Sequence, residues 1–383
     1  MNNIEVIICL LMLFMGVPDL CRKLGRPALV YPAFVLFGLV LGSWVTGDVK
    51  SMVHEAGKVG FLLLLFEVGL DIDLPRWKEF LRPLRYAMKW SLVQYPLVFG
   101  LANVAGLTLG ESFLSAAALT GCSVGMAYAG WKQYAGLAAV AKPFVCLVMV
   151  ALEMLAIVVM AADSAALAYG LHWVVALKLA GIFTAIFLVS QFNAHLTRLF
   201  QIILQKTTHW RVHLLVLLVL VICAIGERLG LSAAKTAFFL GLFMSRAEHD
   251  GVSLEQFMAP ISSRFLIPLF FVALGVQVQW STLFSMIGML AVVAGAILLA
   301  AREVLHRRWM PTGGDARACL LFCPNLTLVA LAATILLEHR PESTGAVWVL
   351  LTGLFMSIVS LLMLPATQSK TGEAEPAAAT ESS

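Results

Sequence analysis

Long apolar runs recur along almost the whole chain, and they constrain its fold more than any other feature of the sequence. Each run has the length of an α-helix that crosses a bilayer, about 20 residues. Only 13% of the 383 residues are charged, against roughly 25% in soluble domains, so the runs cannot be the cores of soluble domains. They are continuous rather than alternating with period two, which favours helices over strands. We therefore predict an all-α membrane protein with about 13 transmembrane helices, over residues 4–20, 28–46, 52–72, 87–108, 112–129, 140–161, 170–191, 212–230, 232–246, 263–279, 283–305, 316–337 and 344–364.

Basic residues are concentrated in alternate loops between these runs. Nineteen Lys and Arg follow the odd-numbered runs, whereas four follow the even-numbered ones. Because positively charged loops stay in the cytoplasm, we expect the N-terminus outside and the C-terminus inside a cell inner (plasma) membrane. The net charge of +4 lies in these loops and does not indicate binding to nucleic acid. The apolar runs are expected to be in contact with membrane lipid. The small polar tail 367–383 is expected to be disordered.

Two of the runs carry residues that interrupt a helix. The stretch "AALTGCSVGMAYAG" at 117–130 has two glycines among small polar residues, and "LLFCPNLTLVALA" at 320–332 has Pro324 followed by Asn325. Proline removes a backbone donor and disfavours helix at the residue before it. Broken helices at membrane depth occur where they are buried in protein or line a cavity, and their freed groups hold ions or substrate. The alternative is a simple kink in each helix.

A single acid stands in the middle of the run "LVMVALEMLAIVVMA" at 147–161, in which every residue except Glu153 is apolar. An acid at the centre of a spanning helix costs roughly 2.5–3.5 kcal/mol on insertion scales, so such residues are usually functional. The functional reading is a carboxylate that binds either a proton or a small cation. The structural alternative is a protonated glutamate that forms a hydrogen bond between helices.

Two segments share a pattern but enter the membrane from opposite sides. "LGRPALVYPAFVLFGLVLGS" at 24–43 and "LGLSAAKTAFFLGLFMS" at 229–245 both open with Leu-Gly and continue as glycine-punctuated apolar helices. On the expected topology the first enters from inside and the second from outside. Opposite entry is typical of inverted repeats in secondary transporters.

Nearly the whole chain, from about residue 5 to 365, resembles the monovalent cation:proton antiporters, in the branch of Kef-type potassium efflux systems and bacterial sodium/proton exchangers. The stretches that carry the resemblance are "RPALVYPAFVLFGLVLG", "LLLLFEVGLDIDL", "LTGCSVGMA", "GLSAAKTAFFLGLFMS" and "PLFFVALGVQVQWSTL", at 26–42, 62–74, 119–127, 230–245 and 268–283. The last is the most specific, because Pro-x-Phe-Phe-x-x-x-Gly occurs there at the correct spacing from the others.

The resemblance implies a fold of inverted five-helix repeats with two broken crossing helices. It implies one transmembrane domain over 1–366, with a dimerisation panel at about 1–80 and 212–280 and a core bundle at about 87–161 and 283–364. Alternating access would then be an elevator-like movement of the core against the panel, and the protein would be a homodimer.

The resemblance also implies roles for residues of the two runs. Glu153 falls where the family carries its essential aspartate, and Leu152 falls where it carries Asn or Asp. Cys122 and Ser123 match the unwound pair, where Ser123 would offer a hydroxyl to the cation with help from Thr120. A thiol is a poor ligand for a hard alkali ion, so backbone carbonyls would supply the remaining ligands. With a single carboxylate, exchange is expected to be electroneutral.

Three further residues are expected to support this site. Arg302 falls near the family's buried basic residue, where it would steady the broken-helix ends; the alternative is an arginine at the inner interface, continuous with Arg307 and Arg308. Pro324 and Asn325 stand where many relatives have a Gly-Glu pair, and Asn325 is expected to cap a half-helix.

Two functions follow from these features. The first is a secondary antiporter that exchanges Na⁺ or K⁺ for H⁺, with no cofactor and no metal beyond the transported cation. The second is a transport-inactive or regulatory homologue of the same fold, which Leu152, Cys122 and the missing Gly-Glu pair favour. An intramembrane enzyme is disfavoured, since the apolar runs hold no H-E-x-x-H motif.

Overall fold

A computed structural model of the chain describes residues 3–26, 29–71, 77–122, 142–169, 211–228, 233–244, 248–249, 252–253, 258, 261–309, 322–340 and 344–363. The predicted seventh run at 170–191, the tail at 367–383 and Ser123 lie outside the described residues.

The described elements are helices, apart from one two-residue antiparallel pairing between β1 (Glu248–His249) and β2 (Val252–Ser253). In chain order the helices are α1 (Asn3–Lys23), α2 (Val30–Gly42), α3 (Gly47–Asp71), α4 (Trp77–Val104), α5 (Leu109–Thr120), α7 (Lys142–Tyr169), α9 (Arg211–Arg228), α10 (Ala233–Met244), the π-helix η2 (Ser262–Leu266), α12 (Ile267–Gln277), α13 (Trp280–Leu283), α14 (Met286–Trp309), α15 (Leu326–His339) and α16 (Thr344–Met363).

Four of the described helices are long and apolar enough to cross a bilayer on their own, in α1, α7, α14 and α16. Three apolar segments are shorter, at Val30–Gly42, Ser262–Gln277 and Leu326–His339. The last of these belongs to the interrupted run at 320–332, and half of an interrupted helix covers only part of the membrane depth.

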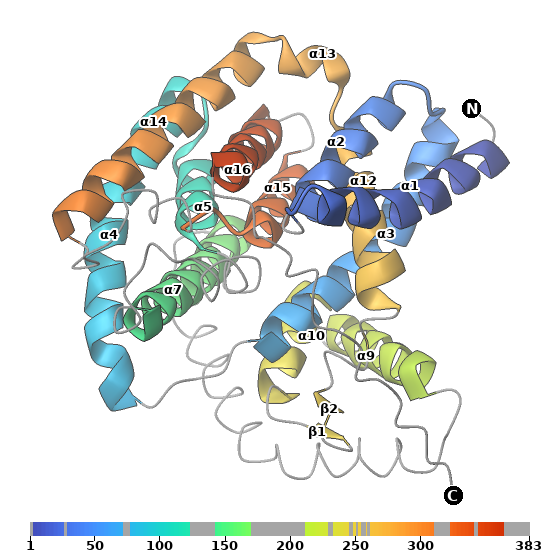
Figure 1. Cartoon of the computed structure of the whole chain (residues 1–383), viewed down its shortest axis with the longest axis horizontal. Helices are drawn as coiled ribbons and strands as arrows, with labels where there is room; N and C mark the ends of the chain where they lie inside the picture. The colour runs from blue at the N-terminus through green and yellow to red at the C-terminus, as the bar shows by residue number, and fades with distance from the viewer. Residues whose placement is uncertain are drawn as a thin grey trace, which may run out of the picture.

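The helices pack in two groups that lie side by side (Figure 1). One group is built around α3, which packs on α10 and α12, while α12 also packs on α2. The other group contains α4, α5, α7, α14, α15 and α16, with α4 against both α5 and α7 and with α16 against α14 and α15. The division of the chain into a dimerisation panel and a core bundle stays a prediction.

Glycines set the closest approach inside the first group. A β-carbon on Gly275 of α12 would lie 2.1 Å from the carbonyl oxygen of Val35, and one on Gly38 of α2 would lie 2.2 Å from that of Val272. Backbones at such distances exclude any side chain, which is how small residues pack membrane helices tightly. The Pro-x-Phe-Phe-x-x-x-Gly pattern therefore ends in a glycine that the α2–α12 contact requires.

Replacing Gly275 by Ala is expected to lower the melting temperature of the detergent-solubilised protein, at a cost of about 1–3 kcal/mol for an overpacked contact. The matched control is Gly100→Ala, since a β-carbon on Gly100 meets no atom within 4 Å and alanine favours helix. Thermal unfolding of both variants beside the parent protein checks this. Equal melting temperatures for Gly275→Ala and the parent would contradict the contact.

Several boundaries differ from the prediction, and two helices begin at least five residues earlier than expected. The fourth run was expected from residue 87, but α4 begins at Trp77, so Arg82 and Arg85 lie on a helix and not in a loop. The third run was expected from residue 52, but α3 begins at Gly47. An apolar run measures the length of helix in contact with hydrocarbon, whereas the helix itself continues into the interface, where polar and basic side chains reach water.

Candidate functional site

The two interrupted runs meet each other inside the second group of helices. Helix α5 ends at Thr120, and Gly121 then has extended backbone with ψ 134°. Cys122 pairs with Pro324 in an isolated antiparallel bridge, and the backbone N–H of Asn325 donates to the Gly121 carbonyl at 2.9 Å. Helix α15 begins at the next residue. One described helix therefore ends, and another begins, where these two extended segments pair; we call this point the crossing.

Asn325 caps the half-helix that starts at the crossing, as the sequence predicted. Its side-chain oxygen accepts a hydrogen bond from the Thr327 amide at 2.9 Å. The first amides of a helix lack partners within the helix and carry a partial positive charge, so this end of α15 favours an anion. On the other side, the Ser357 hydroxyl of α16 donates to the Pro324 carbonyl at 3.4 Å.

The side chain of Glu153 faces this crossing. It lies in the interior of α7 and is only 6% exposed. The Asn325 Nδ2 atom donates to Glu153 Oε1. Asn325 thus uses its amide oxygen for the helix and its amide nitrogen for the acid, and so places the carboxylate at the positive end of α15. The polar partner that Leu152 does not provide on α7 comes instead from the crossing segment.

Arg302 holds the broken ends together. It is 1% exposed on α14, and its guanidinium donates to the Phe322 and Leu119 carbonyls and to Gln94 Oε1, the last at 3.2 Å from Nε. Leu119 lies in the last turn of α5 and Phe322 precedes α15, so one side chain ties both interrupted segments to α4. Arg302 is thus buried inside the bundle, whereas Arg307 further along α14 is exposed; the supporting role of Arg302 stays a prediction.

Gln94 was missed in the sequence. The only signal for it is one amide within the otherwise apolar stretch "SLVQYPLVFG" at 91–100. A single amide of this kind predicts no partner, because Arg302 is far away along the chain.

The remaining predicted ligands have different surroundings. The Thr120 hydroxyl donates to the Ala116 carbonyl at 2.6 Å and thus to its own helix. The Cys122 thiol is fully buried, 3.7 Å from the Thr120 carbonyl. Leu152 is buried with Cys122 in an apolar cluster. The residues from Gly121 to Gly125 also fit the spacing G-x-S-x-G, but a helix precedes them, not the strand that a hydrolase nucleophile requires.

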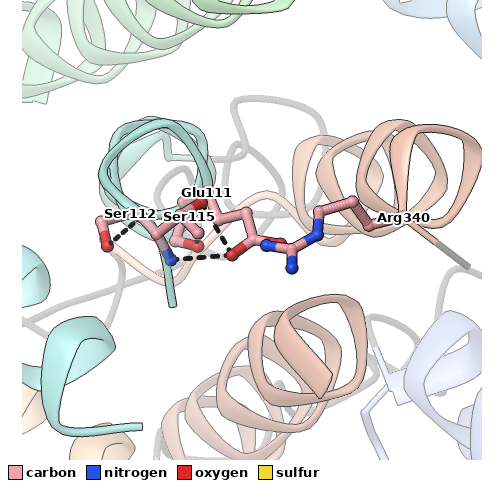
Figure 2. A network of polar contacts seen from close by, with 5 residues as sticks. Glu111, Ser112, Ser115 and Arg340 are labelled. Atoms are coloured by element: carbon pink, nitrogen blue, oxygen red, sulfur yellow. Dashed lines mark hydrogen bonds and ion pairs between the residues drawn. The ribbon is translucent and has the colours of Figure 1, made fainter. Parts of the chain in front are cut away.

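An ionic contact joins the start of α5 to the end of α15. Glu111 lies in the first turn of α5 and accepts from the Thr108 backbone amide at 2.8 Å as part of a capping box. It also accepts from the Thr108 hydroxyl at 2.9 Å. Figure 2 shows Arg340, at the end of α15, reaching toward this carboxylate. The distance from Arg340 Nη1 to Glu111 Oε1 is 3.7 Å. Helices α5 and α15 are therefore fixed to each other both at the crossing and at their far ends.

A helix end and a helix start that pair beside a buried carboxylate, in an otherwise apolar bundle, are the arrangement that a membrane transporter uses at its ion site. The chain belongs to the sodium/hydrogen exchanger family: the model for the transmembrane part of that family matches residues 9–366. It is thus a member of the monovalent cation:proton antiporters, and the resemblance seen in the sequence is confirmed.

Curated relatives include the glutathione-regulated potassium-efflux system protein KefC. The protein from Escherichia coli O17:K52:H18 is 27% identical over 332 residues, and that from Shigella flexneri serotype 5b is 28% identical over 332 residues. Each match covers 75% of this chain and 51% of the relative, so the chain spans about half the length of these relatives.

A solved structure shares the fold. The sodium proton antiporter MjNhaP1 from Methanocaldococcus jannaschii superposes with a TM-score of 0.66 over 94% of this chain and 95% of that one, at 15% sequence identity. The helical architecture predicted from the sequence is therefore that of a known antiporter fold.

Proposed function

We propose that the protein exchanges a monovalent cation, Na⁺ or K⁺, for H⁺ across the membrane, with Glu153 as the group that binds either ion. The observation that carries the proposal is the contact between Glu153 and Asn325, which places a buried acid at the crossing of two broken helices. A potassium-efflux protein among its relatives and a sodium proton antiporter with the same fold support the same chemistry.

Three residues at the crossing have a role in this proposal. Glu153 is neutralised by a proton or by a cation, and one site cannot hold both. Asn325 orients the carboxylate toward the capped end of α15, and backbone carbonyls of the extended segments supply hard oxygen ligands. Arg302 occupies the Leu119 and Phe322 carbonyls and fixes the crossing, so it is a positioning residue.

Among the described residues at the crossing, Glu153 is the one carboxylate, and this bears on the stoichiometry. Among the described residues of α7, Leu152 stands next to Glu153 and contributes no charge. If one proton replaces one monovalent cation at Glu153, each cycle moves no net charge. We therefore propose electroneutral exchange, carried by movement of the group around α7 against the group around α3, in a homodimer with its N-terminus outside.

Proton flux into proteoliposomes tests the proposal directly. An outward gradient of Na⁺, K⁺ or Li⁺ is imposed at several pH values, and an internal pH dye records the response. Acidification driven by at least one cation is the expected result. For the Na⁺ and Li⁺ gradients, its rate should not change when valinomycin and equal K⁺ concentrations on both sides clamp the membrane potential at zero. Flux whose rate follows the clamped potential would contradict electroneutrality.

The second function is a regulatory membrane homologue that no longer transports. The apolar surroundings of Leu152 and the buried thiol of Cys122 favour it, because each stands where the family offers a polar group. The same assay separates the two, since proteoliposomes that show no flux with any of the three cations at any pH would support the second function.

A further inference from the structure

A row of polar side chains runs along α4 toward Arg302. Tyr86, Trp90 and Gln94 follow one another at intervals of four residues, which places them on one face of the helix; we call them the α4 polar row. The exposed Arg82 precedes the row by the same interval. From Arg82 to Gln94 the helix rises about 18 Å. The row therefore connects the basic end of the bundle with the crossing.

Each member of the row has a buried polar atom that makes no hydrogen bond within the structure. These atoms are the Tyr86 hydroxyl, Trp90 Nε1 and Gln94 Nε2. Trp90 is 1% exposed and Gln94 is 0% exposed. A buried donor left without an acceptor costs about 1–3 kcal/mol, and in native proteins such groups are satisfied by protein atoms or by ordered water.

The side chains packed around Tyr86 and Trp90 are mostly apolar. Trp90 belongs to an apolar cluster with residues of α7 and α14, among them Val145, Met149 and Leu305. The Trp90 ring stacks at 5.3 Å on Phe322, which His306 contacts from α14 at 6.1 Å. Tyr86 and Trp90 lie in or against this apolar cluster, while Gln94, one turn further on, accepts from Arg302. Packing alone would select apolar side chains at positions 86 and 90, so their buried donors need another explanation.

We propose that the α4 polar row binds a file of water molecules that leads from the basic end of the bundle to Arg302 and the crossing. Ordered water with two or more polar partners is stable inside proteins, and donors about 6 Å apart along a helix are bridged by one water each. The file ends beside Phe322, whose carbonyl Arg302 binds and which precedes Asn325 by three residues.

The role of the water file rests on the proposed function, whereas its presence does not. In an antiporter, Glu153 must exchange protons with the cytoplasm, and a file of water along α4 provides that route within the core group. Cations would reach the site by another route, since the row consists largely of donors. The row thus concerns proton access and not cation selectivity.

Hydroxyl-radical labelling of the intact protein in detergent, read by mass spectrometry, tests for the water itself. Radiolysis generates radicals from water next to a side chain, so a buried tryptophan beside bound water is oxidised. We expect Trp90 to be oxidised at a rate within about threefold of that of the exposed Trp44, despite its burial. Gln94→Leu should reduce the oxidation of Trp90 several-fold, whereas Thr352→Val, which removes a buried hydroxyl on α16, should not.

Transport provides an independent measurement. Trp90→Phe keeps a smaller aromatic ring and leaves the partners of Arg302 in place, but it removes the indole donor. It should slow proton flux several-fold without changing the cation that drives it. Labelling of Trp90 in a protein that shows no flux would support the water file while refuting the antiporter. Absence of Trp90 oxidation in the parent protein, or oxidation that Gln94→Leu leaves unchanged, would overturn the proposal.

Discussion

Replacing Glu153 by Gln is expected to reduce cation-driven proton flux to the level of empty liposomes. Glutamine has the same shape and its amide oxygen can still accept from Asn325 Nδ2, so the crossing keeps its hydrogen bond. What the substitution removes is the charge that a proton or a cation must neutralise. The same proteoliposome assay with Na⁺, K⁺ and Li⁺ measures the effect.

Two controls make this result specific. Glu303→Gln removes an exposed glutamate of α14 that pairs with Arg307, and flux should remain near that of the parent. Glu153→Asp restores the charge with one methylene fewer, so it should recover part of the flux at a changed cation affinity. Retained exchange in Glu153→Gln, with the protein folded, would refute Glu153 as the carrier.

Local chemistry made much of this site predictable. Pro324 removes a backbone donor and glycine favours helix weakly, so the helix end near Gly121 and the helix start after Pro324 could be predicted from the sequence. An acid in an apolar run is costly enough to mark Glu153 as exceptional wherever the fold places it. The asparagine after the proline is a common helix cap, and α15 uses it as one.

The contacts between distant segments were not predictable in this way. Asn325 and Glu153 are 172 positions apart, and Arg302 and Gln94 are 208 positions apart. Nothing in either neighbourhood specifies the partner, because the pairing is set by how α4, α7 and α14 pack around the crossing. Leu152 illustrates the consequence: read alone it removes a polar partner from Glu153, yet the partner is supplied by another helix.

Replacing Arg302 by Met is expected to have the second large effect, a loss of roughly 3 kcal/mol or more in stability, since buried acceptors left without donors cost about 1–3 kcal/mol each. Three acceptors are involved: the Leu119 carbonyl, the Phe322 carbonyl and Gln94 Oε1. Methionine fills much of the volume but donates to none of them. The melting temperature in detergent should fall sharply, and flux should be lost because the crossing no longer has a fixed shape.

The comparison with Arg307 decides which reading of Arg302 is correct. Arg307 lies five residues further along α14, where its exposed side chain pairs with Glu303, and exposed pairs contribute little to stability. If Arg302 were one more interfacial arginine, Arg302→Met and Arg307→Met would lower the melting temperature equally little. Because Arg302 binds both broken ends, Arg302→Met should melt far below Arg307→Met. Arg302→Lys should fall between them, since one ammonium keeps the charge but cannot reach three acceptors arranged around a planar guanidinium.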